Sequence, residues 1–128
     1  MKLGISLAII AVFIASTNSL HSMKHDDYLP DGNYVVVYPS NSNAKVKLSG
    51  GQMTIIGCNS LFTSYNLYSN SDFAVGYWVS TRMYCPSAPE VPISHLVEDS
   101  RRAIQESNGS ISFKDEAGKT TLILVKID

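Results

Sequence analysis

Apolar and polar residues alternate with a period of two over much of the chain, beginning at Tyr34. The clearest case is residues 45–48 (KVKL), in which each lysine is followed by an apolar residue. A strand that is buried on one face and solvated on the other has this period. Residues 49–51 (SGG) then predict a tight hairpin turn, after which Met53 and Ile55 share one face of the next strand.

Further strands are predicted by short runs that are rich in β-branched and aromatic residues and end at clusters of Pro, Ser, Asn or Asp. These runs cover residues 34–38, 64–68, 73–84, 110–114 and 120–127, the last two as a closing hairpin. Residues 73–84 form either one long strand or two strands separated by a bend near Ser80. Within residues 73–84 the alternation predicts that Tyr77 lies on the same face as Phe73, with Trp78 opposite.

One segment departs from the period of two. Apolar and small residues recur there at helical spacing, at Ile93, Leu96, Val97, Ser100 and Ile104. Pro92 suits a first helical turn, and Asn108-Gly109 supplies a stop. About seven strands with one helix before the C-terminal hairpin predict a small α+β domain. We expect a mostly antiparallel curled sheet or partial barrel, with the helix covering one opening.

The N-terminus has the pattern of a secretory signal. Lys2 precedes an apolar run over residues 3–15, and small polar residues follow. We expect a signal peptide over residues 1–19, cleaved after Ser19, with cleavage near Thr17 or an uncleaved anchor as alternatives. Residues 20–33 then predict a flexible leader, and residues 34–128 a single domain. The predicted location is secreted, either extracellular or periplasmic.

The charge balance and the lengths of the apolar segments narrow the class of protein further. The 128-residue chain has 10 basic and 11 acidic side chains and a formal net charge of −1. This balance lacks the basic surplus that nucleic-acid binding requires. No second apolar segment is long enough to span a bilayer, so the mature chain is predicted to have no membrane span. We expect a monomer.

Cys58 and Cys85 are the only two cysteines. In an exported chain two cysteines most often form a disulfide, and closing this loop would stabilise the fold by about 3–4 kcal/mol. Two buried free thiols are the competing interpretation, because cysteine is also a common core residue. The wide spacing lacks the paired short intervals of a structural zinc site, and no metal or cofactor is predicted.

Two strings around these cysteines resemble a known family. The first is Gly57-Cys58-Asn59 at the end of a predicted strand, with Tyr65 a few residues later. The second is residues 80–85 (STRMYC), and a helix and terminal hairpin follow. In this order they resemble the META domain family, which includes HslJ-like bacterial lipoproteins and Leishmania META proteins. The motif residues are Gly57, Cys58, Asn59, Thr81, Met83 and Cys85.

The resemblance implies a compact β-rich fold with one helix and no catalytic residues or cofactor. It also implies an association with stress, drug resistance, virulence or secretion. The chain departs from the family at Thr63-Ser64, where bacterial members often have a glycine before the tyrosine. It also lacks a cysteine near the predicted cleavage site, so it does not resemble the lipoprotein members in being anchored.

The motif also has a physical interpretation. A glycine before Cys58 permits a backbone bend or a close strand approach, and the Asn59 amide can satisfy backbone groups where the strand ends. Both roles are structural. Arg82 could reach a carboxylate or occupy a solvated strand position.

The sequence offers little support for catalysis. A cysteine nucleophile needs a histidine base, and His95 is the only histidine in residues 34–128. No serine lies in a Gly-x-Ser-x-Gly elbow, so a hydrolase triad has no support. Asn108-Gly109-Ser110 fits the glycosylation acceptor pattern in a predicted exposed turn, and Asn108 would be modified if the source is a eukaryote.

We therefore predict a secreted, noncatalytic META-like domain that binds another protein at the cell envelope or outside the cell. It could inhibit a protease by presenting a loop, and residues 39–43 and 85–92 are the candidate segments. The alternative is a carrier of a small apolar ligand within the β-core, which requires a cavity. A thiol enzyme is the third hypothesis.

Overall fold

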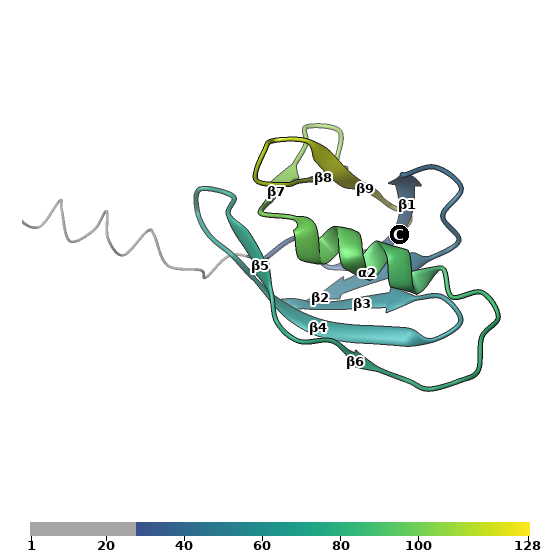
Figure 1. Ribbon diagram of the computed structural model, residues 1–128. Coiled ribbons are helices and arrows are strands. Elements are labelled where there is room, and N and C mark those ends of the chain that lie inside the picture. The colour runs from purple at the N-terminus through teal and green to yellow at the C-terminus, as the bar shows by residue number, and fades with distance from the viewer. Residues whose placement is uncertain (1–27) are drawn as a thin grey trace, which may run out of the picture.

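The computed structural model describes residues 28–128; the predicted signal and the leader up to residue 27 lie outside the described residues. The described part contains nine strands and one helix (Figure 1). The strands are β1 (Gly32–Tyr38), β2 (Lys45–Ser49), β3 (Gln52–Ile56), β4 (Ser60–Leu67), β5 (Phe73–Val75), β6 (Val79–Ser80), β7 (Arg102–Gln105), β8 (Ile111–Lys114) and β9 (Thr120–Lys126), and the helix is α2 (Glu90–Asp99).

All strand pairs are antiparallel, and the sheet is nearly closed into a barrel. The strand order is β5-β4-β3-β2-β1-β9-β8-β7, and β6 pairs with β4 beside this path. An isolated bridge between Asp72 and Arg102 brings the start of β5 against β7. The backbone N–H of Ala103 donates to the carbonyl of Ser71, and that of Phe73 to the carbonyl of Arg101. The two ends of the strand order thus meet, as expected for a mostly antiparallel barrel.

The alternating pattern of residues 45–56 produces the predicted hairpin. β2 pairs with β3 up to Ser49 and Gln52, which leaves a two-residue turn. Its residues Gly50 and Gly51 have φ values of 55° and 84°, which side chains other than glycine rarely adopt. Met53 and Ile55 are fully buried on the inner face, as the period of two predicts.

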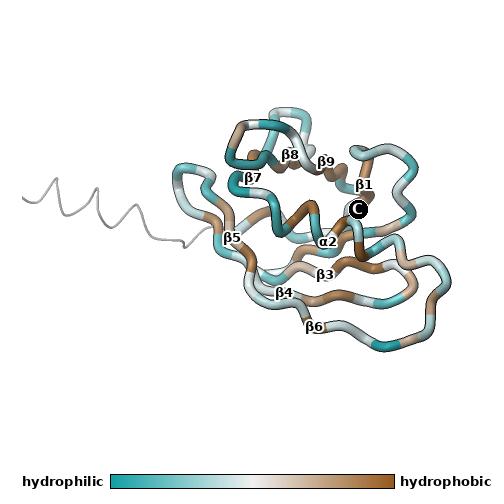
Figure 2. The backbone as a smooth tube through the Cα atoms, in the orientation of Figure 1, coloured by the Kyte–Doolittle hydropathy of each residue, from teal (hydrophilic) through white to brown (hydrophobic). Residues whose placement is uncertain are grey.

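Helix α2 lies across the opening of the barrel and closes the core. Its buried residues Glu90, Ile93, Ser94 and Val97 follow helical spacing and form one stripe. Figure 2 shows apolar residues along β3, β8 and β9 and hydrophilic residues in the loops at the top of the view. The largest fully buried apolar side chains are Tyr34, Val46, Leu48, Met53, Ile55, Ile93, Val97, Ile111, Phe113, Leu122 and Leu124.

A ladder of aromatic rings joins the strands at the other side of the core. The rings of Tyr65 and Phe73 lie 5.7 Å apart, and those of Phe73 and Phe113 lie 5.1 Å apart. The Tyr65 hydroxyl accepts a hydrogen bond from the backbone N–H of Leu29 at 2.9 Å. Burial raises the pKa of Tyr65 to about 12, and the hydrogen bond from Leu29 opposes that rise.

Two predictions about the extent of the sheet need correction. The described residues contain nine strands instead of about seven, because the predicted strand over 73–84 is divided and β7 was not expected. The sheet also begins before the boundary placed between residues 33 and 34. β1 starts at Gly32, and Leu29 is already buried.

The predicted helix end at Asn108-Gly109 is wrong. α2 starts at Glu90 and ends at Asp99, and Ser100 is extended with φ −78° and ψ 139°. The Arg101 backbone N–H then donates to the carbonyl of Lys114, and β7 pairs with β8. Ile104 matched helical spacing, but the strand pairing buries Ala103 in the core and overrides that local pattern.

The faces predicted within residues 73–84 are also wrong. Tyr77 is 96% exposed, whereas Phe73 is buried and Trp78 packs partly against the core. β5 pairs Val75 with Tyr65, and β6 pairs Val79 with Phe62. From Val75 to Val79 the chain therefore contains one residue more than the opposite stretch of β4 from Phe62 to Tyr65. An extra residue reverses the alternation of faces, which is how Val79 comes to the solvent side.

Within residues 28–128, no helix is long and apolar enough to cross a bilayer.

Candidate functional site

The disulfide joins two loops that leave the sheet. Cys58 and Cys85 are bonded, with their Cα atoms 6.2 Å apart, so the predicted disulfide is confirmed and the free-thiol interpretation is wrong. Cys58 lies in the turn between β3 and β4, and Cys85 lies in the loop between β6 and α2. The bond ties this loop to the end of the β-hairpin.

Asn59 holds the same two loops together through its side-chain amide. Its Oδ1 accepts hydrogen bonds from the Thr81 hydroxyl at 3.0 Å and the Met83 backbone N–H at 2.7 Å. Its Nδ2 donates to the Met83 carbonyl at 3.1 Å and to Cys85 Sγ at 3.4 Å. Thr81 Oγ1 also accepts from the backbone N–H of Ser60 at 3.0 Å. The amide thus takes the place of a strand partner for the backbone N–H and C=O of Met83.

Glu90 connects this region to the helix, and the sequence analysis did not single it out. Its side chain is 1% exposed, and its carboxylate accepts backbone hydrogen bonds from Cys58 at 2.9 Å and Asn59 at 3.2 Å. A Cβ at position 57 would collide with Glu90 Oε1 and stand 3.0 Å from the Glu90 backbone nitrogen. Gly57 is therefore required for the close approach of the helix.

We call this arrangement the junction, consisting of Gly57, Cys58, Asn59, Thr81, Met83, Cys85 and Glu90. All six residues of the predicted motif belong to it, and Glu90 is the seventh. Gly57 allows the close approach of the helix residue Glu90 instead of a neighbouring strand, and the Asn59 amide bonds to the backbone of Met83. Glu90 was missed because its bonds to residues 58 and 59 span more than 30 positions and leave no local pattern.

Next to the junction lies a surface of exposed apolar and aromatic side chains. Val79 on β6 pairs with Phe62 on β4, and both are exposed. Tyr77, Phe62 and Val79 line a shallow cleft of about 310 Å³. In the loop after β6, Met83 is 61% exposed and Tyr84 is 91% exposed. We call these five residues the β6 surface.

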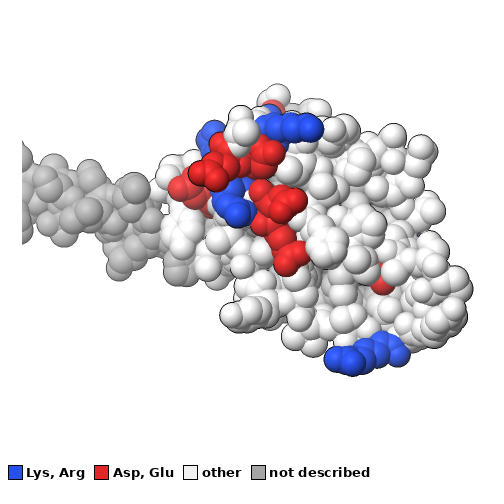
Figure 3. Space-filling view, in the orientation of Figure 1, with Lys and Arg blue, Asp and Glu red and all other residues white. Residues whose placement is uncertain are grey.

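The β6 surface differs in charge from the area around the end of α2. Figure 3 shows charged side chains gathered around the end of α2 and the nearby hairpins, whereas the area over β4 and β6 is white except for a basic group at its lower border. Between Asp72 and Glu90 in the sequence, Arg82 is the only charged residue. It is exposed, which agrees with a solvated position, and among residues 28–128 it forms no ion pair with a carboxylate.

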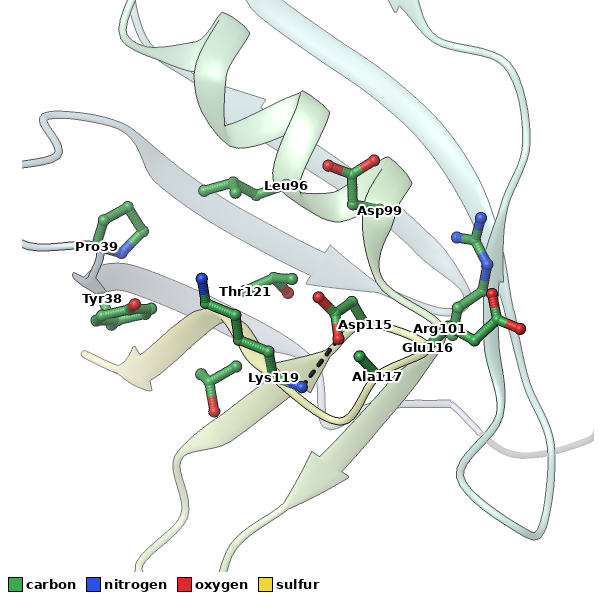
Figure 4. A pocket seen from close by; sticks show the side chains of 11 residues that line it. Tyr38, Pro39, Leu96, Asp99, Arg101, Asp115, Glu116, Ala117, Lys119 and Thr121 are labelled. Carbon is green, nitrogen blue, oxygen red and sulfur yellow. Dashed lines mark hydrogen bonds between the residues drawn. The ribbon is translucent and has the colours of Figure 1, made fainter.

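A cleft lined by several charged residues lies at the other side of the helix, between the end of α2, Tyr38 and the β8–β9 turn. Its volume is about 570 Å³. Figure 4 shows Leu96 and Asp99 on the helix, with Lys119 extending across from the hairpin. The turn is fixed by Asp115, whose Oδ1 accepts from the Lys119 backbone N–H at 2.9 Å.

This cleft is open and mixed in character. Acidic and basic groups alternate around it, and Arg101 is occupied in holding the helix end through bonds to the carbonyls of Glu98 and Ser100. The described residues contain no cluster of three or more His, Cys, Asp or Glu side chains that could hold a metal ion. The arrangement offers polar contacts without a convergent set of reactive groups.

The remaining predicted sites are separate from the junction. His95 is exposed on α2, and its Nδ1 lies 3.1 Å from Glu98 Oε1. Asn108 lies exposed in the β7–β8 turn, where its Oδ1 accepts hydrogen bonds from the backbone N–H and hydroxyl of Ser110. Its Nδ2, the atom that a glycan would join, has no hydrogen-bond partner among residues 28–128.

Comparisons with known proteins give the fold and little else. No family model matches the chain, and no curated protein matches it. Among solved structures, the chain is similar to the NMR structure of a protein from Burkholderia xenovorans. The TM-score is 0.56 at 16% sequence identity, over 77% of this chain and 83% of that one. A likeness at this identity shows a shared fold alone.

Proposed function

We propose that this chain is a secreted, noncatalytic META-like domain that acts by binding another protein at the cell envelope or outside the cell. The observation that carries the proposal is the β6 surface: exposed Phe62, Tyr77, Val79, Met83 and Tyr84 beside a rigid junction. Tyrosine, phenylalanine and methionine are enriched in protein interfaces, where they supply contact area.

The junction supports binding because it fixes the surface in advance. The loop that presents Met83 and Tyr84 is bound through Asn59 and the disulfide, so little conformational freedom remains to be lost on association. A disulfide is also compatible with an oxidising compartment outside the cytoplasm. The META-like assignment rests on the six motif residues, all of which belong to the junction.

Protease inhibition is one form that such binding could take. The segment 85–92 starts at the disulfide and enters α2 at Glu90, so it is a loop held at both ends. The segment 39–43 is a second loop, in which the Ser42 hydroxyl donates to the Pro39 carbonyl at 3.1 Å. Loops restrained in this way suit presentation to a protease, and stress or virulence association would follow from the partner.

The proposal is tested by site-specific photo-crosslinking. The chain carries a photoreactive phenylalanine analogue at Tyr84, and a matched chain carries it at Glu116 in the β8–β9 turn, which is also exposed. Both are incubated with the secreted and envelope proteins of the source organism. We expect a defined crosslinked species from position 84 that is absent from position 116. No species, or the same species from both positions, would contradict the proposal.

The carrier hypothesis stays a prediction. In the described residues the space between the sheet and α2 is filled by core side chains such as Tyr34, Met53 and Phe113. The clefts described above lie at the surface and include polar or charged residues. The thiol-enzyme hypothesis would require reduction of the disulfide first.

A further inference from the structure

We propose that the open edge of β6 accepts an extended segment of the bound protein as an additional antiparallel strand, and that Arg82 selects a segment that carries a carboxylate. This inference rests on the proposed function, because it specifies how the β6 surface binds its partner.

The first argument concerns which strand edges lack a partner. Because the barrel is nearly closed, the two ends of the strand order lie against each other. The edges of β5 and β7 meet through the Asp72–Arg102 bridge and the bonds on either side of it. β6 pairs with β4 on one side, and no described strand pairs with its other side. An unpaired edge presents N–H and C=O groups that can pair with another chain.

The second argument is the direction of the backbone groups along this edge. The Thr81 N–H donates to the Ser60 carbonyl, and both backbone groups of Met83 bond to the Asn59 amide. In an extended chain, successive residues point their backbone groups to opposite sides. Ser80, the last residue of β6, lies between Val79 and Thr81 and therefore points its N–H and C=O groups outward. We infer the same for Arg82, which follows β6 and lies between two residues whose N–H groups bond inward.

The third argument is the chemistry of the side chains that flank this edge. Val79 and Phe62 form an apolar cross-strand pair on the solvent face, and Met83 and Tyr84 are exposed in the loop that follows. An added strand with apolar residues at every second position would pack on them. Arg82 is the only charge in the segment and favours a carboxylate, which it can bind through two N–H groups.

A displayed library tests this inference directly. Random peptides of about twelve residues, long enough to pair along the whole edge, are selected against the disulfide-bonded chain. We expect the selected peptides to have apolar residues at every second position and to contain Asp or Glu. Their affinity should fall at least about tenfold for Ser80→Pro, which removes an outward N–H, and for Arg82→Glu. The matched control Glu116→Lys, in the charged cleft, should leave affinity unchanged.

Hydrogen exchange is measured on the wild-type chain, so it tests the inference even if Ser80→Pro disturbs the fold. In the wild-type complex with a selected peptide, the amides of Ser80 and Arg82 should exchange at least about tenfold more slowly. Unchanged exchange at both amides would overturn the inference. Failure to select any peptide would overturn it too, as would association of two copies of this chain through the same edge.

The outcomes separate this inference from the proposed function. If binding is lost in Tyr84→Ala but not in Ser80→Pro or Arg82→Glu, the β6 surface binds by side chains alone, and only the strand addition is wrong. If binding is insensitive to Tyr84→Ala as well, and position 84 gives no crosslink, the proposed function is also wrong.

Discussion

The chain is held in two different ways in two parts of the molecule. Between β2 and β3, regular backbone pairing runs from Lys45 to Ser49, and alternate side chains fill the core. Between β6 and α2, the last backbone bond to β4 is the one from the Thr81 N–H to the Ser60 carbonyl, and the rest of residues 81–85 is held by the Asn59 amide, the Thr81 hydroxyl and the disulfide.

The difference explains why one part is structural and the other suits recognition. A paired strand with one buried face must direct its apolar residues inward. A loop held by specific side-chain bonds has no such requirement, so Met83 and Tyr84 stay exposed without becoming mobile. The junction thus preserves an apolar surface that the barrel itself would bury.

The largest effect is expected from removing the disulfide. The double variant Cys58→Ala/Cys85→Ala should lose about 3–4 kcal/mol of unfolding free energy, because the bond closes a loop with a sequence separation of 27. Urea unfolding measures the loss, and hydrogen exchange should quicken at residues 81–85 before β2 and β3. Reductant should lower the unfolding free energy of the wild type by the same amount and should leave that of the double variant unchanged. If hydrogen exchange became faster to the same extent at residues 81–85 and in β2 and β3, the proposed difference between the two parts would be wrong.

The next largest effect is expected at Gly57. Gly57→Ala places a methyl group against the Glu90 carboxylate and should cost about 2–3 kcal/mol, because the two buried bonds from Cys58 and Asn59 are displaced. Gly76→Ala is the matched control: its Cβ would meet Ser64 Oγ at 3.5 Å, an ordinary contact. It should change the unfolding free energy by less than about 1 kcal/mol. Similar losses from both variants would contradict the role of the junction.

A smaller effect is expected at Asn59. Asn59→Ala removes the bonds to Thr81, Met83 and Cys85 and should cost about 1–2 kcal/mol. Asn59→Asp keeps the acceptor for the Met83 N–H but loses the two donations, so its loss should be intermediate. The exchange rate of the Met83 amide, followed by NMR, should rank the chains in the same order. An Ala variant with the stability of the wild type would contradict this bonding scheme.

The smallest effect is expected at alkaline pH in the barrel. The pKa of Tyr65 is raised from 10.0 to about 12, mainly by burial, so the folded chain keeps a proton that the unfolded chain loses. The free energy of unfolding should therefore fall as the pH rises from 10 to 12. Part of this fall should persist in Tyr65→Phe, because burial also raises the pKa of Tyr34. A variant with the full wild-type fall would contradict the assignment to Tyr65.

The regular part of the fold could be predicted from the sequence, because its determinants are local. The alternation at residues 45–56 and the glycine pair predicted the β2–β3 hairpin with its faces. The predicted helix start near Pro92 lies close to the observed start at Glu90. The predicted end was wrong, because the pairing of β7 with β8 depends on residues that are distant in the sequence. Gly76 lies between β5 and β6 and can mark a bulge, but the alternation was continued through it, so Tyr77 was placed on the wrong face.

The candidate site was predicted in part. The motif residues were identified as a structural set, and the disulfide followed from the expected compartment. The role of Glu90 was not predictable, because a carboxylate in a first helical turn is ordinarily solvated. The β6 surface was missed as well, since an exposed aromatic residue and a core aromatic residue look alike in a sequence.

Hydrogen exchange of the wild-type chain, free and bound to the protein recovered by crosslinking, tests the central claim most directly. The account predicts that amides between residues 77 and 84 gain protection in the complex, while those of the β8–β9 turn at residues 115–119 do not change. Protection confined to the turn and the charged cleft, with residues 77–84 unchanged, would contradict the claim that the β6 surface is the binding site.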